Sequence, residues 1–291
     1  MIIVKCQGGL GNQMLQYIFY LYLKNTVKPE VKIDISGFRF HGAHQGYELE
    51  KVFGIRPQYC TWLDKVRELG IDGIELHPKL VGPSHWRKQR DRLVRKGKCL
   101  RFSTFDAYNY MQTQMIMDHL YIDGYFLNHE FFDAVQEKAQ KAFTFQKKLD
   151  GRNQEIAEKL RAEKVVGIHV RLGDYTNDDK WNVCDKEYYT RAIAYCRERL
   201  GDIKLYVFSD EDASQVLPEE YSYEYVTWNQ GENAYIDMQL MAMCSNLIIA
   251  NSTFSYLGAL LNTNTGKIVI APAHYNKNEP RPLAGKEWIT L

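Results

Sequence analysis

The chain begins Met1-Ile2-Ile3-Val4-Lys5-Cys6-Gln7-Gly8-Gly9-Leu10-Gly11-Asn12-Gln13, and the order of residue types in this stretch is typical of an α/β fold. The β-branched run from Ile2 to Cys6 predicts a buried strand. A glycine-rich turn follows, and the apolar and aromatic residues from Met14 to Lys24 predict a buried helix. A strand, a glycine-rich turn and a helix form the opening unit of nucleotide-binding α/β folds.

The alternation of strands and helices continues along the chain. Further strands are expected at residues 31–35, 165–170, 205–209, 223–228, 247–250 and 267–271, and further helices at 61–69, 187–200, 234–244 and 254–261. Strands that alternate with helices of about ten residues indicate βαβ units and a parallel sheet. Because a polar stretch, Gln146–Gln154, separates the two halves, we predict two domains, residues 1–150 and 151–291.

The composition excludes several classes of protein. The 291 residues are 45% hydrophobic and 25% charged, which excludes a disordered or collagen-like chain. A net charge of +1 argues against a nucleic-acid binder, because such proteins are normally basic overall. The six cysteines form no CxxC pair, and neither a signal peptide nor a membrane-spanning apolar run is visible. We therefore expect a cytoplasmic protein with reduced thiols.

One segment is strongly basic, since residues 87–101 hold eight Lys and Arg side chains. A solvated helix face is the first interpretation of this run. The alternative is weak attraction to an anionic lipid surface or to an acidic substrate, and any membrane contact would be peripheral.

Ligands of parallel α/β sheets bind beyond the carboxyl ends of the strands, so the residues after each predicted strand are the candidates. After the first strand, Gly9 and Gly11 let the backbone approach a ligand, and the helix that follows favours an anion. This turn is neither the GxGxxG fingerprint nor a Walker A loop. Taken by itself, it serves packing as readily as binding.

The strand at 165–170 runs into His169, Arg171 and Asp174. His169 and Arg171 are two residues apart and point to the same side of the strand. An arginine at a strand end can bind phosphate oxygens through two parallel hydrogen bonds. Asp174 could orient this arginine or accept a hydrogen bond from a sugar hydroxyl. The alternative is a buried network of the three side chains that only holds a loop.

Two further groups follow strands. Asp210 and Asp212 form a DxD pattern, which holds a divalent metal in one class of sugar transferases, but both also suit the start of a helix as capping residues. Asn251-Ser252-Thr253-Phe254-Ser255 precedes a helix, where hydroxyls and backbone amides can bind phosphate or merely cap. Since no nucleophile motif is present, these groups favour a diphosphate site with no metal over a hydrolase.

Several of these segments resemble the α-1,2-fucosyltransferases of glycosyltransferase family 11. The similar segments are Gly8–Met14, Asp123-Gly124-Tyr125-Phe126, His169–Tyr175, Tyr188-Tyr189 with Ala192-Ile193, Phe208-Ser209-Asp210 and Asn251–Ser255. The order of segments matches over nearly the whole chain. Two positions depart from the family pattern: Leu127 replaces the usual glutamine, and Tyr256-Leu257 replaces the usual tryptophan pair.

The resemblance implies a GT-B architecture, in which two Rossmann-like domains face a cleft and the C-terminal one holds GDP-fucose. It implies that Arg171 neutralises the leaving diphosphate, that Asp174 supports the arginine or the ribose, and that Asn12 reaches the reacting sugar. His169 and Asp237 would contact the guanosine. The diphosphate and the sugar would be bound by Ser252, Thr253, Phe254 and Ser255, with Gly9, Gly11 and Asp210 also on the donor side. The reaction would need no metal and no other cofactor.

The implied reaction is an inverting transfer of L-fucose from GDP-β-L-fucose to the C2 hydroxyl of a terminal β-galactoside. Acceptor choice would depend on residues 1–150 and donor binding on residues 151–291. The general base stays open by residue type between Asp174, Asp178, Asp179, His41, His44 and Glu130. The other functions that the sequence permits are a different GT-B transferase of nucleotide sugars and a non-catalytic carbohydrate-binding protein.

Overall fold

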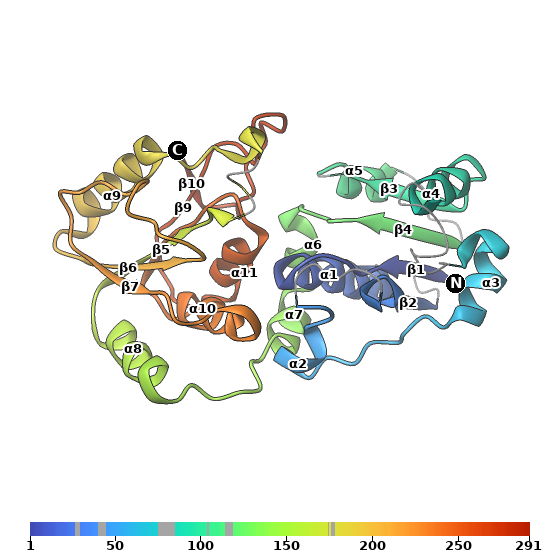
Figure 1. The fold of residues 1–291 in the computed structure, drawn as a ribbon, viewed down its shortest axis with the longest axis horizontal. Coiled ribbons are helices and arrows are strands. Elements are labelled where there is room, and N and C mark those ends of the chain that lie inside the picture. Colours follow the sequence, from blue (N-terminus) through green and yellow to red (C-terminus); the bar gives the residue numbers. More distant parts are fainter. Residues whose placement is uncertain are drawn as a thin grey trace. The chain divides into compact units, whose positions relative to one another are not determined.

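The chain divides into two compact units, Met1–Gln146 and Lys147–Leu291, each built on a parallel sheet with helices around it (Figure 1). The computed structural model describes residues 1–26, 30–39, 45–74, 85–103, 105–113, 119–173, 175 and 178–291. Among these residues, no helix has the length and apolarity that crossing a bilayer requires.

The sheet of the first unit has four parallel strands in the order β2-β1-β4-β3. These are β1 (Ile2–Lys5), β2 (Val31–Asp34), β3 (Cys99–Phe102) and β4 (Leu120–Gly124). The glycine-rich turn leads from β1 into the long helix α1 (Leu10–Thr26), whose apolar residues are almost all buried. All four carboxyl ends therefore lie at one edge of the sheet.

Shorter helices complete the first unit. In chain order they are η1 (Ser36–Arg39), α2 (Leu49–Phe53), α3 (Trp62–Leu69), η2 (Ile71–Gly73), α4 (His85–Arg95), α5 (Asp106–Thr113), α6 (His129–Asp133) and α7 (Gln136–Ala142). The start of α3 is set by a capping box, in which Thr61 and Asp64 satisfy each other's backbone amides. A helix at 61–69 is therefore confirmed, and its local sequence explains it.

The sheet of the second unit has six parallel strands in the order β10-β9-β8-β5-β6-β7. They are β5 (Val165–Val170), β6 (Lys204–Ser209), β7 (Tyr223–Val226), β8 (Asn246–Ile248), β9 (Val269–Ala271) and β10 (Ile289–Thr290). Numbered within the unit, this is the order 3-2-1-4-5-6 of Rossmann folds. The direction of the connections reverses between β5 and β8, where such folds bind their ligands.

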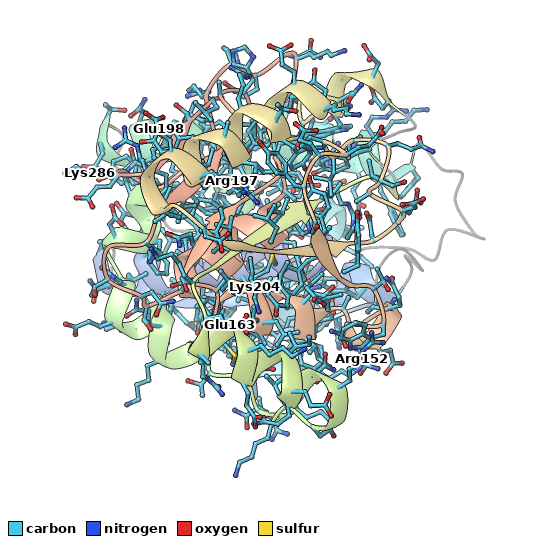
Figure 2. All side chains as sticks on the ribbon, turned by 90° about the vertical axis from the view of Figure 1, so that its left-hand side faces the viewer. Arg152, Glu163, Arg197, Glu198, Lys204 and Lys286 are labelled. Carbon is cyan, nitrogen blue, oxygen red and sulfur yellow. The ribbon has the colours of Figure 1, made fainter. Side chains whose placement is uncertain are left out.

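The helices of the second unit are α8 (Gly151–Ala162), η4 (Asp179–Trp181), α9 (Lys186–Leu200), η5 (Gly231–Asn233), α10 (Tyr235–Met241) and α11 (Thr253–Leu261). An ion pair joins Glu163, just past α8, to Lys204 at the start of β6, with 2.8 Å between Oε1 and Nζ (Figure 2). The core between the sheet and α9 holds Tyr188 and Tyr189, both completely buried. Their hydroxyls donate to backbone carbonyls, so burial leaves neither unsatisfied.

The strands and helices expected from the sequence are present, with ends that differ by a few residues, and the prediction of an α/β fold with parallel sheets is confirmed. The basic run at 87–101 is helical only in its first part. Its helix, α4, ends at Arg95, and the run continues through a turn into β3, which lies at the edge of the sheet. The sequence patterns did not predict β4, β10 or the helices α2, α5, α6, α7 and α8.

Candidate functional site

The candidate residues of the second unit lie at the carboxyl ends of four neighbouring strands, β8, β5, β6 and β7. His169 is the second-to-last residue of strand β5, and Arg171 directly follows the end of the strand. Asp210 follows β6, and α11 begins after β8. Because β5 pairs with both β6 and β8, the residues after these three strands are brought together at the reversal point of the sheet.

Arg171 and Asp210 form an ion pair across the ends of β5 and β6. Arg171 Nη1 lies 2.7 Å from Asp210 Oδ2, and the backbone N–H of Leu172 donates to Asp210 Oδ1 over 3.0 Å. The carboxylate thus holds both the side chain and the backbone of the strand end. Gly173 makes room for it, since a Cβ there would lie 2.6 Å from Oδ2. About a third of the Arg171 side chain stays exposed to a ligand.

Tyr175 supports Arg171 from another side. The guanidinium carbon lies 5.6 Å from the centre of the Tyr175 ring, within the range of a cation–π contact. The ring stacks on Trp181, and its hydroxyl donates to the carbonyl of Asn251 over 3.3 Å. Arg171 is therefore oriented by the loop after β5 as well as by Asp210.

His169 is buried beside this pair and carries no charge at neutral pH. Burial, with a smaller effect of the nearby Arg171 charge, lowers the pKa of His169 to about 3. Its Nδ1 is buried and finds no hydrogen-bond partner within the described residues. The ring packs on Phe254, with 5.8 Å between the ring centres. His169 is therefore a neutral, buried imidazole whose Nδ1 is closed off from solvent.

The polar residues at the start of α11 differ in whether their hydroxyls form hydrogen bonds within the fold. Ser252 is the N-cap, and its hydroxyl accepts from the N–H of Phe254 over 3.3 Å. Ser255 is completely buried, and its hydroxyl donates to the carbonyls of Ala250 and Ser252. Thr253 and Phe254 are half-buried at the first turn. The helix N-terminus can still attract an anion, while the Ser255 hydroxyl is used within the fold.

Asp237 lies in the first turn of α10 and takes part in a buried network. Asn229 Nδ2 donates to Asp237 Oδ1 over 2.7 Å, and Asn229 is in turn hydrogen-bonded to Asn153 of α8. The indole N–H of Trp228 donates to the same Asn153. Burial raises the pKa of Asp237 to about 7, although the Asn229 hydrogen bond opposes this. The carboxyl therefore changes charge within the physiological pH range.

Both acids of the DxD pattern interact with nearby groups of the protein. Asp210 binds Arg171, and the exposed Asp212 accepts from the backbone N–H of Ser214 over 2.9 Å. Within the part of the chain that is described, no group of three His, Cys, Asp or Glu side chains is placed to hold a metal ion. Both acids line a cavity of about 500 Å³ that also contacts Tyr225, Thr227 and Gln230.

In the first unit, the glycine-rich turn places Gly9 just before α1 and Gly11 and Asn12 in its first turn. Gly8 adopts a φ of +81°, and a Cβ on it would lie 2.6 Å from Asn12 Nδ2. The Asn12 amide therefore folds against Gly8. Because α1 begins at Leu10, Asn12 is not the residue that caps the helix.

Three of the candidates for the general base, Asp174, His41 and His44, lie outside the described residues. Asp178 and Asp179 form ion pairs with Lys180 and Lys277 at the surface. Glu130 is near His129, with 3.4 Å between Glu130 Oε2 and His129 Nδ1. None of these contacts distinguishes a base.

Sequence reasoning missed three features of this site. Asp210 was expected on the donor side, yet its pairing with Arg171 was not foreseen, because residues 39 positions apart meet only through strand pairing. The hydroxyl of Tyr189 holds the carbonyl of His169 over 3.0 Å, and only the resemblance of the Tyr188-Tyr189 segment pointed to it. The Asn153–Asn229 pair had no sequence signal.

The chain is similar to known proteins over most of its length. The sequence model of glycosyl transferase family 11 matches residues 98–291. An α-1,2-colitosyltransferase of Escherichia coli is 26% identical over 100% of this chain and 98% of its own. The O-antigen biosynthesis glycosyltransferase WbnK of the same species is 28% identical over 98% of both chains. The crystal structure of the fucosyltransferase NodZ from Bradyrhizobium shares the fold, with a TM-score of 0.50 and 15% identity over 89% of this chain and 92% of that one.

Proposed function

This chain belongs to glycosyl transferase family 11, and we propose that it transfers L-fucose from GDP-β-L-fucose to the C2 hydroxyl of a terminal β-galactoside. The observation that carries the proposal is the Arg171–Asp210 pair at the reversal point of a Rossmann sheet. A fixed cation at that position is what a diphosphate leaving group needs. A GT-B arrangement of the two units belongs to the same proposal.

Charge develops on the diphosphate as the bond between fucose C1 and the leaving oxygen breaks. A preorganised donor at such a position typically contributes ~100–1000-fold in rate. Asp210 and Tyr175 keep the guanidinium of Arg171 in one orientation, so little reorganisation is needed when that charge appears. The N-terminus of α11, beginning at Thr253, would add backbone dipoles to the same oxygens.

The nucleoside would be held by buried polar groups. His169 would contact the nucleoside through its neutral ring. Asp237, when ionised, can accept N–H donors of a guanine edge, because a carboxylate has acceptors only. Asn229 keeps that carboxyl oriented. Asn12 of the first unit can donate and accept at once, which suits positioning of a hydroxyl.

The galactose C2 oxygen attacks fucose C1 from the face opposite to the diphosphate, and GDP departs with the bonding electrons. The β-linked donor thus becomes an α-L-fucoside. The proton of the attacking hydroxyl passes to a general base that the described residues do not identify. Arg171 acts on the leaving group, so its loss should affect the chemical step more than acceptor binding.

A second donor is favoured by one relative. The E. coli protein that matches the whole chain is an α-1,2-colitosyltransferase. Colitose is L-fucose without its 3-hydroxyl, so both sugars reach the same C1 geometry and the same α-1,2 linkage. A site that hydrogen-bonds the 3-hydroxyl would reject GDP-colitose strongly, whereas a site that leaves it in water would accept both.

A donor panel tests the proposal. Purified protein is incubated with lactose or another β-galactoside and with GDP-fucose, GDP-colitose, GDP-mannose or UDP-galactose, and the product linkage is read by NMR. We expect an α-1,2-linked fucoside from GDP-fucose. Transfer from GDP-colitose alone would establish the second donor instead. Transfer from neither, with turnover of UDP-galactose, would contradict both.

A further inference from the structure

A cavity of about 420 Å³ opens in the first unit, and none of the described residues assigned above to the donor lines it. Gln7 and Gly8 after β1 and Asp123 and Tyr125 at the end of β4 form one wall, and Trp86 of α4 forms another. The α4 helix packs beside β3 (Figure 1), and its Arg90 contacts Asp123 at the end of β4. The cavity thus lies at the carboxyl ends of parallel strands, the usual binding edge of such a sheet.

Asp123 is almost completely buried in this wall and is already satisfied. It accepts from Gln7 Nε2 over 2.9 Å, and its Oδ2 lies 3.5 Å from Lys5 Nζ and 3.4 Å from Arg90 Nη1. One carboxylate therefore balances two cations. A net positive charge is left between β1, β4 and α4.

Asp72, which lines the cavity, and Asp34, which contacts the lining residue Lys65, are also paired. Asp34, at the end of β2, is buried and pairs with Lys65 over 2.7 Å. Asp72 of η2 pairs with both Arg92 and Lys96, over 2.7 and 2.6 Å. Among the described residues that line the cavity, both carboxylates, Asp72 and Asp123, are therefore paired with cations.

Two arginines of α4 keep capacity for an anion. About a quarter of the Arg90 side chain is exposed, and its ion pair with Asp123 is made through Nη1. Arg87 also lines the cavity, three residues earlier on the same helix. Guanidinium groups bind carboxylates and phosphates through paired N–H groups, so the accessible parts of these two side chains are suited to such an oxyanion.

The walls also fit a sugar ring. Trp86, Phe38 and Tyr125 line the cavity, and more than a third of Tyr125 is exposed. Aromatic faces pack on the C–H faces of sugars, while the polar groups between them bind hydroxyls. Apolar walls with a few convergent cations are typical of a site for a small polar ligand that carries negative charge.

We infer that this cavity binds an acidic sugar residue of the acceptor glycan, adjacent to the galactose that receives fucose. The inference rests on the proposed function for its acceptor, but the cavity is a separate site with its own ligand chemistry. Arg90 and Arg87 hold the anionic group, and the aromatic walls hold the ring. A carboxylate of a uronic acid and a phosphate ester share this chemistry.

The test compares three galactosides that differ only in charge next to the galactose. They are lactose, its analogue with glucuronate in place of glucose, and lactose 1-phosphate. Each is titrated against the full chain by calorimetry, with and without saturating GDP, and without a sugar donor. We expect at least one anionic compound to bind about tenfold or more tightly than lactose, as charge-assisted pairs imply. The anionic compound that binds more tightly shows whether the cavity takes a carboxylate or a phosphate ester.

Variants locate the binding. Arg90→Gln and Arg87→Gln should each remove most of the preference for the anion, measured as the ratio of the affinities for the anionic compound and for lactose. Arg95→Gln is the matched control, because Arg95 is exposed on the same helix and does not line the cavity. Arg87→Gln keeps the test valid if loss of the Arg90–Asp123 pair unfolds the protein, which thermal melting would reveal.

Equal affinity for all three galactosides would overturn the inference, and so would an anion preference that survives both variants. These outcomes are separate from the donor panel. Titration needs no turnover, so a protein that does not use GDP-fucose could still show the anion preference. Conversely, fucosylation of lactose with no preference for the anionic analogues would refute the cavity assignment alone.

Discussion

Arg171 and Asp210, which follow neighbouring strands of the second unit, lie 2.7 Å apart between Nη1 and Oδ2. Each side chain is between a quarter and a third exposed, so the pair stands at the surface of the site and not in the core. Exposed ion pairs contribute little to stability. The value of this pair therefore lies in orienting the guanidinium.

Replacement of Arg171 should nearly abolish transfer while the protein stays folded. Arg171→Ala removes the cation that faces the leaving diphosphate, and Arg171→Lys should restore little, because an ammonium lacks the planar fork of the guanidinium. Arg191→Lys, on the exposed side of α9, is the control. The measurement is kcat/KM of each variant from steady-state kinetics. A variant that keeps more than about a tenth of the parent kcat/KM, a loss below ~1.4 kcal/mol, would contradict the assignment.

Asp210→Asn should lower kcat about ten- to a hundredfold, less than the loss of the arginine itself, because the guanidinium remains but is no longer held. The amide can still accept from the N–H of Leu172. KM for the acceptor should change little. Asp202→Asn, an exposed site before β6, makes the same charge change and should be silent. Equal kinetics for the two variants would remove Asp210 from the positioning of Arg171.

Transfer should proceed at its full rate in EDTA. Asp210 is engaged by Arg171, and Asp212 accepts from the N–H of Ser214, so the DxD pattern has local partners. The measurement is initial rate after dialysis against chelator, with and without added Mn²⁺ or Mg²⁺. Activity that disappears in EDTA and returns with either ion would make these two acids metal ligands.

Asn12→Ala should lower kcat strongly with little change in GDP affinity or melting temperature, since Asn12 lies within the first turn of α1 and does not cap it. Gly8→Ala should have a similar kinetic effect and also destabilise the fold. Its methyl would meet Asn12 Nδ2, and alanine disfavours the positive φ at that residue by about 1 kcal/mol. Asn25→Ala, in the last turn of α1, is the control. A kinetically silent Asn12→Ser would remove Asn12 from the site.

The stability of the second unit should depend on the pH through Asp237. Its pKa is raised from 3.8 to about 7 in the folded protein. Between these values the folded chain holds a proton that the unfolded chain has lost, so stability falls as the pH rises through this window and is lowest above it. Asp237→Asn should remove that dependence and melt above the parent at pH 8. Asp202→Asn supplies the control.

The same titration should control GDP binding, because a carboxylate accepts N–H groups of guanine and a protonated carboxyl accepts them less well. The affinity of the parent for GDP should therefore rise between pH 6 and pH 8, measured by calorimetry in matched buffers. For Asp237→Asn it should be weaker and flat. If the affinity of the parent for GDP did not depend on pH, the guanine base would be bound by residues other than Asp237.

Local patterns were sufficient for most of the secondary structure of both units. β-branched runs and helical periodicity are short-range signals, which is why the strand at 165–170 and the helix beginning near Glu187 were predicted within a residue. Because ligands gather at the carboxyl ends of parallel strands, the sequence also indicated His169, Arg171 and the segment at Ser252 as candidates.

The basic run shows where such patterns fail. Eight Lys and Arg side chains at 87–101 suggest one solvated helix, yet Cys99–Phe102 pairs with β4. Strand pairing is a contact between distant residues and overrides local propensity. The same run supplies Arg90 to a cavity, which its composition could not indicate.

The sequence by itself determined the alternation of elements, the α/β class and the residues that can carry charge to the strand ends, because these follow from residue types and spacings of a few positions. The tertiary structure alone determined which of those residues meet. It paired Arg171 with Asp210, buried the Ser255 hydroxyl, and raised the pKa of Asp237 by removing it from water. Each outcome depends on parallel pairing and packing between segments far apart in the chain, where burial and Coulomb interactions set the chemistry.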